Sequence, residues 1–133
     1  MESMKTAASA YQKMQIDAAV LGASPHELIA KLLGGAIDSI VKAKQHTLKG
    51  DIAAKSKCID VAVSIISDGL RSCLNMEAGG EIASNLDALY DYMLRRLIKA
   101  HAENNPVILD EVISLLREIK MGWDGIKPQH SAE

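Results

Sequence analysis

The chain has 133 residues, of which 48% are hydrophobic, and its 15 basic and 17 acidic residues give a formal net charge of −2. This length predicts one domain with its own core, and the near-neutral charge gives no overall attraction to nucleic acid or to an anionic membrane surface. No apolar run approaches the roughly 18 residues that span a bilayer, so we expect a cytoplasmic protein without membrane insertion. Phenylalanine is absent. The core must therefore be aliphatic and rich in alanine, which favours helices over sheets.

Residues 1–23 are rich in alanine and carry scattered apolar side chains, among them Tyr11 and Ile16. Their spacing gives no clear core face. We expect a flexible or short-helical N-terminal arm whose apolar residues can pack only against the rest of the chain.

The first clear helix begins at Ser24-Pro25-His26-Glu27, which has the pattern of a capping box with proline at the first helical position. Apolar residues then recur with helical spacing as far as Leu48, and Gly50 ends the helix. Gly34 and Gly35 lie in its middle, where each costs about 1 kcal/mol relative to alanine. Close approach of a neighbouring helix and a shallow groove for a partner's backbone are both open explanations.

The end of this helix, His46-Thr47-Leu48-Lys49-Gly50, is similar to the core of histidine phosphotransfer domains. A phosphotransfer domain with His46 as phosphoacceptor is therefore an alternative function. In that family the histidine lies in the middle of a helix, whereas Gly50-Asp51 predicts a helix stop followed by an N-cap and places His46 at a helix end.

A second helix is predicted over about residues 52–74, and its apolar surface is broader than one packed face needs. One stripe contains core candidates, and a second contains Val61 and Ile65. Because a soluble bundle has no internal use for the second stripe, we expect Val61 and Ile65 to contact a partner.

Residues 75–80 form a predicted turn, and residues 81–100 a third helix with one broad apolar arc. Asp91 and Arg95 lie outside this arc as an i, i+4 ion pair, while Tyr92 and Arg96 lie at its border, where a partner could reach them. Asn104-Asn105-Pro106 ends the helix, and the fourth helix has an apolar face from Ile108 to Trp123.

Four helices joined by short connections predict an all-α fold, an antiparallel up-down four-helix bundle over residues 24–126 with an arm at 1–23 and a tail at 127–133. No Glu-x-x-His pair offers a di-metal centre, and the histidines lie at expected helix ends or in the tail, where we expect them to be exposed to solvent. No nucleophile lies beside an oriented base, and no phosphate-binding loop is present. The sequence therefore predicts no cofactor, no metal site and no enzymatic activity.

Three segments resemble the FliS family of flagellar secretion chaperones: Ser-Pro-His-Glu-Leu-Ile at 24–29, Gly-Gly-Glu-Ile-Ala-Ser-Asn-Leu at 79–86 and Leu-Tyr-Asp-Tyr-Met-Leu-Arg-Arg-Leu at 89–97. The resemblance implies a cytosolic helical bundle that binds the disordered C-terminal segment of flagellin. It would prevent premature polymerisation and deliver flagellin to the flagellar type III export gate, without an enzymatic step.

The same resemblance implies which residues contact partners. Tyr11 matches an N-terminal tyrosine associated with covering the empty bundle and with the export gate, and the third-helix motif carries over as Asn85, Leu86, Tyr90, Tyr92 and Arg96. Leu86 and Tyr90 fit the core equally well. A dimeric helical adaptor is a third alternative, since surplus apolar stripes also allow a homodimer.

Overall fold

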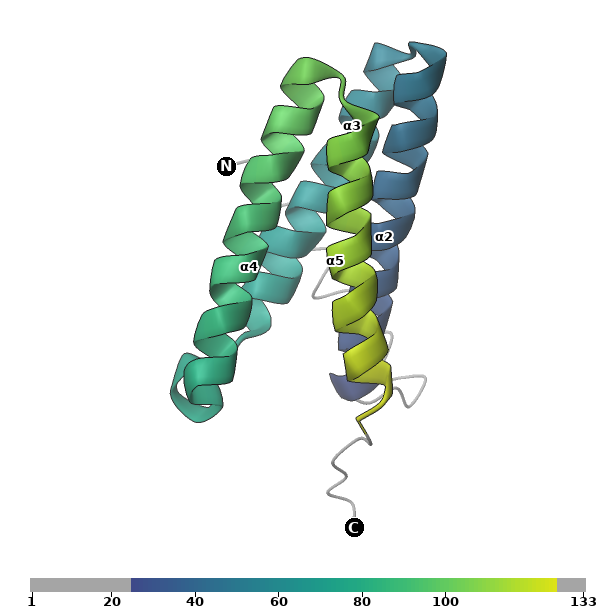
Figure 1. The fold of residues 1–133 in the computed structure, drawn as a ribbon. Helices are drawn as coiled ribbons and strands as arrows, with labels where there is room; N and C mark the ends of the chain where they lie inside the picture. Colours follow the sequence, from purple (N-terminus) through teal and green to yellow (C-terminus); the bar gives the residue numbers. More distant parts are fainter. Residues whose placement is uncertain (1–24, 127–133) are drawn as a thin grey trace.

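The computed structural model describes residues 25–126. In this part of the chain the elements are the α-helices α2 (Pro25–Lys49), α3 (Ile52–Ser64), α4 (Met76–Glu103) and α5 (Pro106–Asp124), with a π-helical turn η1 (Ile65–Leu70) and a 3-10 turn η2 (Arg71–Cys73) between α3 and α4. Consecutive helices run in opposite directions side by side (Figure 1). The predicted all-α, up-down bundle is thus confirmed. The predicted arm at 1–23 and tail at 127–133 lie outside the described residues.

Local capping determines where the helices begin and end. Gly50 adopts a left-handed conformation with φ of 77° after α2, and the Asp51 side chain accepts a hydrogen bond from the Ala54 amide at the start of α3. At the opposite connection, Asn104 has φ of 51° and the Asn105 side chain accepts from the Val107 amide. Both connections are short, so α2 and α3, and α4 and α5, are forced to lie antiparallel.

The predicted second helix over 52–74 is helical as far as Cys73, but it departs from regular α-helical geometry after Ser64. The backbone widens into η1, where the Arg71 amide donates to the carbonyl of Ile66 five residues earlier, and then tightens into η2. A π-turn accommodates an extra residue within a helix and rotates everything that follows it. Ile66 and Leu70 both remain buried across the turn, and Arg71 is directed toward α4. Ile66 and Leu70 keep the i, i+4 spacing of the core face, so the turn changes the backbone without removing either side chain from the core.

The start of α4 also differs from the predicted turn at 75–80. Residues after the Asn75 N-cap already form a helical turn, and Gly80 then interrupts it with φ of 53° and ψ of −128°. Only glycine adopts this conformation without strain. The first turns of α4 are largely exposed to solvent, and Ala83 is the first buried residue of the helix.

One aliphatic core lies along the axis of the bundle. Buried residues come from α2, α3, η1, α4 and α5, and include Leu33, Ile40, Ile66, Met93, Leu97, Leu109 and Leu116. Helix α5 packs more extensively against α2 than against α4. Helix α4 packs least extensively of the four helices against the rest of the bundle.

The structure leaves room for a methyl group at Gly34 and at Gly35, so close approach of a neighbouring helix does not require either glycine. A Cβ at Gly35 would lie 3.5 Å from Ile65 Cδ1, and a Cβ at Gly34 would lie 3.7 Å from Lys120 Cε, both ordinary van der Waals distances. We therefore expect Gly34→Ala and Gly35→Ala each to stabilise the bundle by about 0.5 to 1 kcal/mol, measured by urea denaturation. Destabilisation by either change would mean that the helices approach too closely for a methyl group. Unchanged partner binding by both variants would exclude a groove at these glycines.

Candidate partner-binding groove

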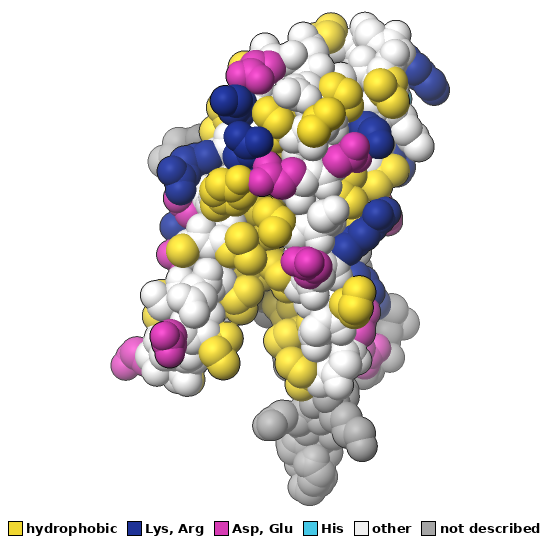
Figure 2. Space-filling model, in the orientation of Figure 1, with side chains coloured by type: hydrophobic (Ala, Val, Ile, Leu, Met, Phe, Trp, Pro, Cys, Tyr) yellow, Lys and Arg dark blue, Asp and Glu magenta, His cyan; other side chains and the backbone are white. Residues whose placement is uncertain are grey.

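A groove with apolar walls separates α4 from α5. Figure 2 shows hydrophobic side chains gathered along the furrow between the two helices, and the furrow widens into a cleft toward the beginning of α4 and the end of α5. The two helices are closest at the other end, where the short Asn104-Asn105 connection joins them. The groove is consequently closed at the connection and open at the far end.

The walls of the groove are formed by side chains that lie on the same sides of α4 and α5 as the contact between Tyr92 and Glu111. On α4, Leu89 lies one turn before Tyr92, and Ile82 and Leu86 continue the same side toward the open end. On α5, Leu115 and Ile119 lie one and two turns beyond Glu111. Ile82 is 73% exposed, and the other four are half-buried beside the core: Leu86, Leu89, Leu115 and Ile119. These side chains form an apolar surface that the described part of the chain leaves incompletely covered.

A polar cluster closes the groove at its narrow end. The Tyr92 hydroxyl donates to Glu111 Oε2 at 2.5 Å, and Arg96 Nε donates to Glu111 Oε1 at 2.7 Å. The guanidinium carbon of Arg96 also lies 6.0 Å from the centre of the Tyr92 ring, in a weak cation–π arrangement. The two carboxylate oxygens thus each have a donor from α4.

These contacts change the ionisation of the cluster. The hydrogen bond from Tyr92, followed by that from Arg96, lowers the pKa of the Glu111 carboxyl, and the same contact with Glu111 raises the pKa of Tyr92. A carboxyl with a lowered pKa stabilises the fold above its unfolded-state pKa, and this contribution is lost as the pH falls through the lowered value. At neutral pH the cluster is therefore intact, with Glu111 ionised.

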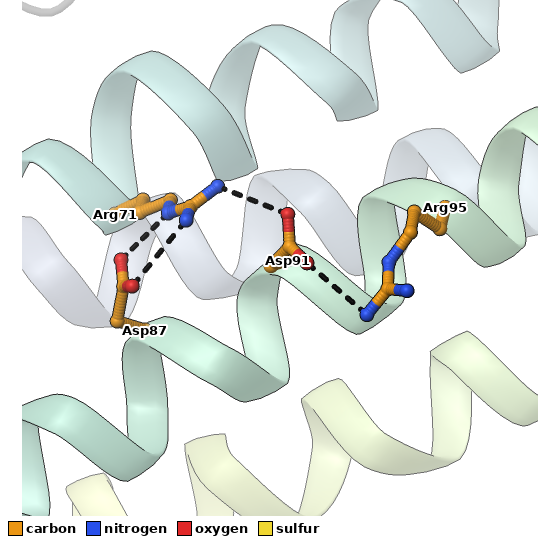
Figure 3. A network of polar contacts seen from close by, with 4 residues as sticks. All are labelled: Arg71, Asp87, Asp91 and Arg95. Carbon is orange, nitrogen blue, oxygen red and sulfur yellow. Dashed lines mark hydrogen bonds and ion pairs between the residues drawn. The ribbon is translucent and has the colours of Figure 1, made fainter.

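A second polar cluster holds the opposite side of α4. Arg71 Nε donates to Asp87 Oδ1 at 2.6 Å and Arg71 Nη2 to Asp87 Oδ2 at 3.3 Å, while Nη1 lies 3.4 Å from Asp91 Oδ1 (Figure 3). Asp91 also forms the predicted i, i+4 ion pair with Arg95, at 3.1 Å. The Arg71 hydrogen bond lowers the pKa of Asp87. Helix α4 is thus held to η2 on one side and to α5 on the other over residues 87–96.

The partner-binding residues predicted from the third-helix motif lie in different environments in the structure. Asn85 is exposed on the same side of α4 as Tyr92, and Leu86 is half-buried in the groove wall. Tyr92 and Arg96 lie at the narrow end. Tyr90 is only 3% exposed, and burial raises its pKa to about 12. Because its ring faces the core, Tyr90 supports the wall from inside and offers no surface for direct contact.

Val61 and Ile65, predicted as partner contacts from the second stripe, do not lie at this groove. Val61 is 50% exposed on α3, whereas Ile65 is half-buried and faces Gly35 of α2. The second stripe is therefore partly core, because α2 packs against it at the level of Ile65. Tyr11 and Ile16 lie outside the described residues.

The histidines of the described chain are not solvent-exposed, contrary to expectation. His26 stacks on Trp123 with ring centres 4.8 Å apart, its Nε2 lies 2.9 Å from the Trp123 carbonyl oxygen, and Trp123 Nε1 donates to the His26 carbonyl at 2.9 Å. His46 and His101 are half-buried, each with Nδ1 inaccessible and unpaired. Residues 25–126 contain no group of three or more side chains suited to a metal ion.

Two residues important to the geometry were missed by sequence reasoning. Glu111 joins α5 to both Tyr92 and Arg96. Lys55 is only 2% exposed, and its ammonium donates to the His101 carbonyl at 3.1 Å and to Asn104 Oδ1. Both act across helices, so spacing within one helix carries no signal for them. For Lys55, the one hint in the sequence is that a lysine occupies a core-facing position of the second helix.

Comparison with known proteins places the chain among relatives that share nearly its whole length. A sequence model of the family described as "Flagellar protein FliS" matches residues 7–130. The chain belongs to the FliS family. Flagellar secretion chaperone FliS of Vibrio cholerae serotype O1 is 42% identical over 127 residues, which cover 96% of this chain and 93% of that protein. FliS of Salmonella typhimurium is 43% identical, with 92% and 90% covered, and FliSB of Pseudomonas aeruginosa is 45% identical, with 87% and 91% covered.

Membership of the FliS family decides among the function classes left by the sequence. The relatives are named as secretion chaperones, a non-enzymatic class, and this agrees with the prediction of no enzymatic activity. The phosphotransfer alternative is not favoured: His46 lies in the last turn of α2, and its Nδ1 is buried. None of the helices in residues 25–126 has the length and hydropathy to cross a membrane.

Proposed function

We propose that this FliS family member is a cytosolic export chaperone for flagellin. It binds the disordered C-terminal segment of flagellin, prevents premature polymerisation and delivers the subunit to the flagellar type III export apparatus. The observation that carries this proposal is the apolar groove between α4 and α5, in a chain whose relatives are named flagellar secretion chaperones.

The geometry of the groove suits an amphipathic helical segment. Such a segment places its apolar face against Ile82, Leu89 and Leu115 and leaves its polar face in water. The segment orders as it binds, so its conformational entropy opposes the burial of apolar surface. This balance keeps the affinity low enough for release at the export gate while the apolar face of flagellin stays covered.

Contacts beyond the groove belong to the same proposal. Asn85, Leu86, Tyr92 and Arg96 contact the client at the walls and narrow end of the groove, with Tyr90 as their support from the core. Val61 offers a second exposed contact on α3, whereas Ile65 is half-buried against α2. The arm at 1–23, with Tyr11 and Ile16, covers apolar surface in the empty chaperone and contacts the export gate.

Co-purification tests the proposal directly. The chain is expressed with full-length flagellin, with flagellin lacking its last few dozen residues, and alone. We expect a stable complex with the full-length client and none with the truncated one. Equal recovery of both flagellins would place the contact elsewhere and contradict the proposal. Size-exclusion chromatography of the chain alone, in the same experiment, reads out the homodimer alternative, which predicts self-association without flagellin binding.

A further inference from the structure

The donors and the acceptor of the cluster at the narrow end come from different helices. Tyr92 and Arg96 lie one turn apart on α4, so both donors come from one rigid element. Glu111 comes from α5. A tyrosine hydroxyl and an arginine N–H that each take one oxygen form a two-point site for a carboxylate. The site itself is therefore built by α4 alone, and Glu111 is its occupant.

The polar attachment of α4 to α5 depends on one side chain of α5. Over residues 25–126, the side-chain hydrogen bonds between α4 and α5 are those that Glu111 makes with Tyr92 and Arg96. On the other side α4 is held by Arg71 through Asp87 and Asp91. A segment that enters the groove between α4 and α5 therefore meets Glu111 and its donors, and not the Arg71 contacts, which lie on the other side of α4.

Water already reaches the cluster. The exposed fractions of the side chains are 29% for Arg96 and 36% for Glu111, and Tyr92 is 36% exposed as a residue. Glu111 can therefore turn outward, where water hydrates the carboxylate in place of the two donors that it gives up. The Arg96 charge and the Tyr92 hydroxyl would then be covered by the bound segment, and a donor that is covered without an acceptor costs about 1 to 3 kcal/mol. A carboxylate on the bound segment removes this penalty.

We propose that Tyr92 and Arg96 form a binding site for an acidic side chain of the bound segment, and that Glu111 is an internal carboxylate which this side chain replaces. The inference rests on the proposed function, because it assumes that a client segment occupies the groove. It adds the chemistry of the client: an apolar helical face that carries an aspartate or glutamate at the level of the narrow end. Glu111 then acts as a competitor that closes the empty groove and weakens binding of segments without this acid.

Calorimetric titration with two peptides tests the exchange. One peptide is the C-terminal segment of flagellin, and the other has its aspartates and glutamates replaced by asparagine and glutamine. For the unaltered chain we expect the amide peptide to bind about 10-fold more weakly. In Arg96→Gln the difference in affinity between the two peptides should largely vanish, because this variant lacks the guanidinium charge that binds the carboxylate. In Glu111→Gln, the acidic peptide should bind about 3- to 10-fold more tightly, since the competing carboxylate has been neutralised.

Asp110→Asn is the matched control for Glu111→Gln. Asp110 precedes Glu111 on α5 but forms its ion pair with Lys44 of α2, at 2.9 Å, so its neutralisation should leave both affinities unchanged. The exchange is overturned if the amide peptide loses as much affinity in Arg96→Gln as in the unaltered chain, or if Glu111→Gln binds the acidic peptide equally or more weakly. In those outcomes the proposed function stands. If neither peptide binds the unaltered chain, the proposed function fails with the exchange.

Discussion

Replacement of Ile82 by glutamate is expected to weaken binding of the flagellin C-terminal segment about 10- to 100-fold. Ile82 is 73% exposed on the open half of the groove wall, so it contributes little to the core of the free chain. A bound helix would bury it, and full burial of an isoleucine contributes about 1.5 to 3 kcal/mol, which corresponds to this range of affinity. The glutamate would add the desolvation of a charge with no partner. Calorimetry or fluorescence anisotropy with a labelled segment measures the loss.

Ile98→Glu is the matched control for this change. Ile98 is also an isoleucine of α4 and is 65% exposed, but the helical rotation of 16 residues places it on the side away from Ile82. Both variants should keep their far-UV circular dichroism and unfold within about 0.5 kcal/mol of the unaltered chain, as is usual for exposed positions. Equal loss of binding in both variants would mean that the segment does not lie in the α4–α5 groove.

The helix ends were predictable from sequence because they depend on local chemistry. Asp51 and Asn105 cap helices through their own side chains, and Gly50 ends α2 with a positive φ. The apolar arc predicted for residues 81–100 includes Met93 and Leu97, which lie in the core. Ile82 belongs to the same arc but is exposed, because α5 has already diverged from α4 at that level (Figure 1). Periodicity identifies the apolar side of a helix but cannot tell how far along the helix a neighbour follows it.

The polar contacts of the candidate site were less predictable. Spacing placed Tyr92 and Arg96 at the edge of the apolar arc, within reach of a partner. The structure identifies their partner in the free chain as Glu111, which lies 19 residues after Tyr92 and 15 after Arg96. The π-turn at η1 is likewise absent from the apolar pattern, because Ile66 and Leu70 have the i, i+4 spacing of a regular α-helix. The contacts of Glu111 arise from packing between segments, and an isolated helical pattern contains no information about them.

The largest expected loss of stability from a polar substitution is that of Lys55→Met, about 1.5 to 3 kcal/mol. The Lys55 ammonium is the shared donor for the His101 carbonyl and the Asn104 side chain, and it lies at the C-terminal end of α4, where a positive charge interacts favourably with the helix dipole. Methionine retains most of the buried apolar stem but leaves both acceptors without their donor, and hydrogen bonds to charged groups contribute about this much. Thermal unfolding should show a decrease in Tm of roughly 5 to 15 °C.

Two further variants separate the roles of charge and backbone at this end of the bundle. Lys57→Met removes an exposed lysine two residues along the same helix and should change the stability by less than about 0.5 kcal/mol. Asn104→Gly keeps the left-handed backbone, with φ of 51°, but removes one of the two acceptors, so its loss should be smaller than that of Lys55→Met. If Lys55→Met were as stable as Lys57→Met, the buried ammonium would contribute nothing net. Desolvation of the charge would then cancel the hydrogen bonds that the ammonium makes to α4.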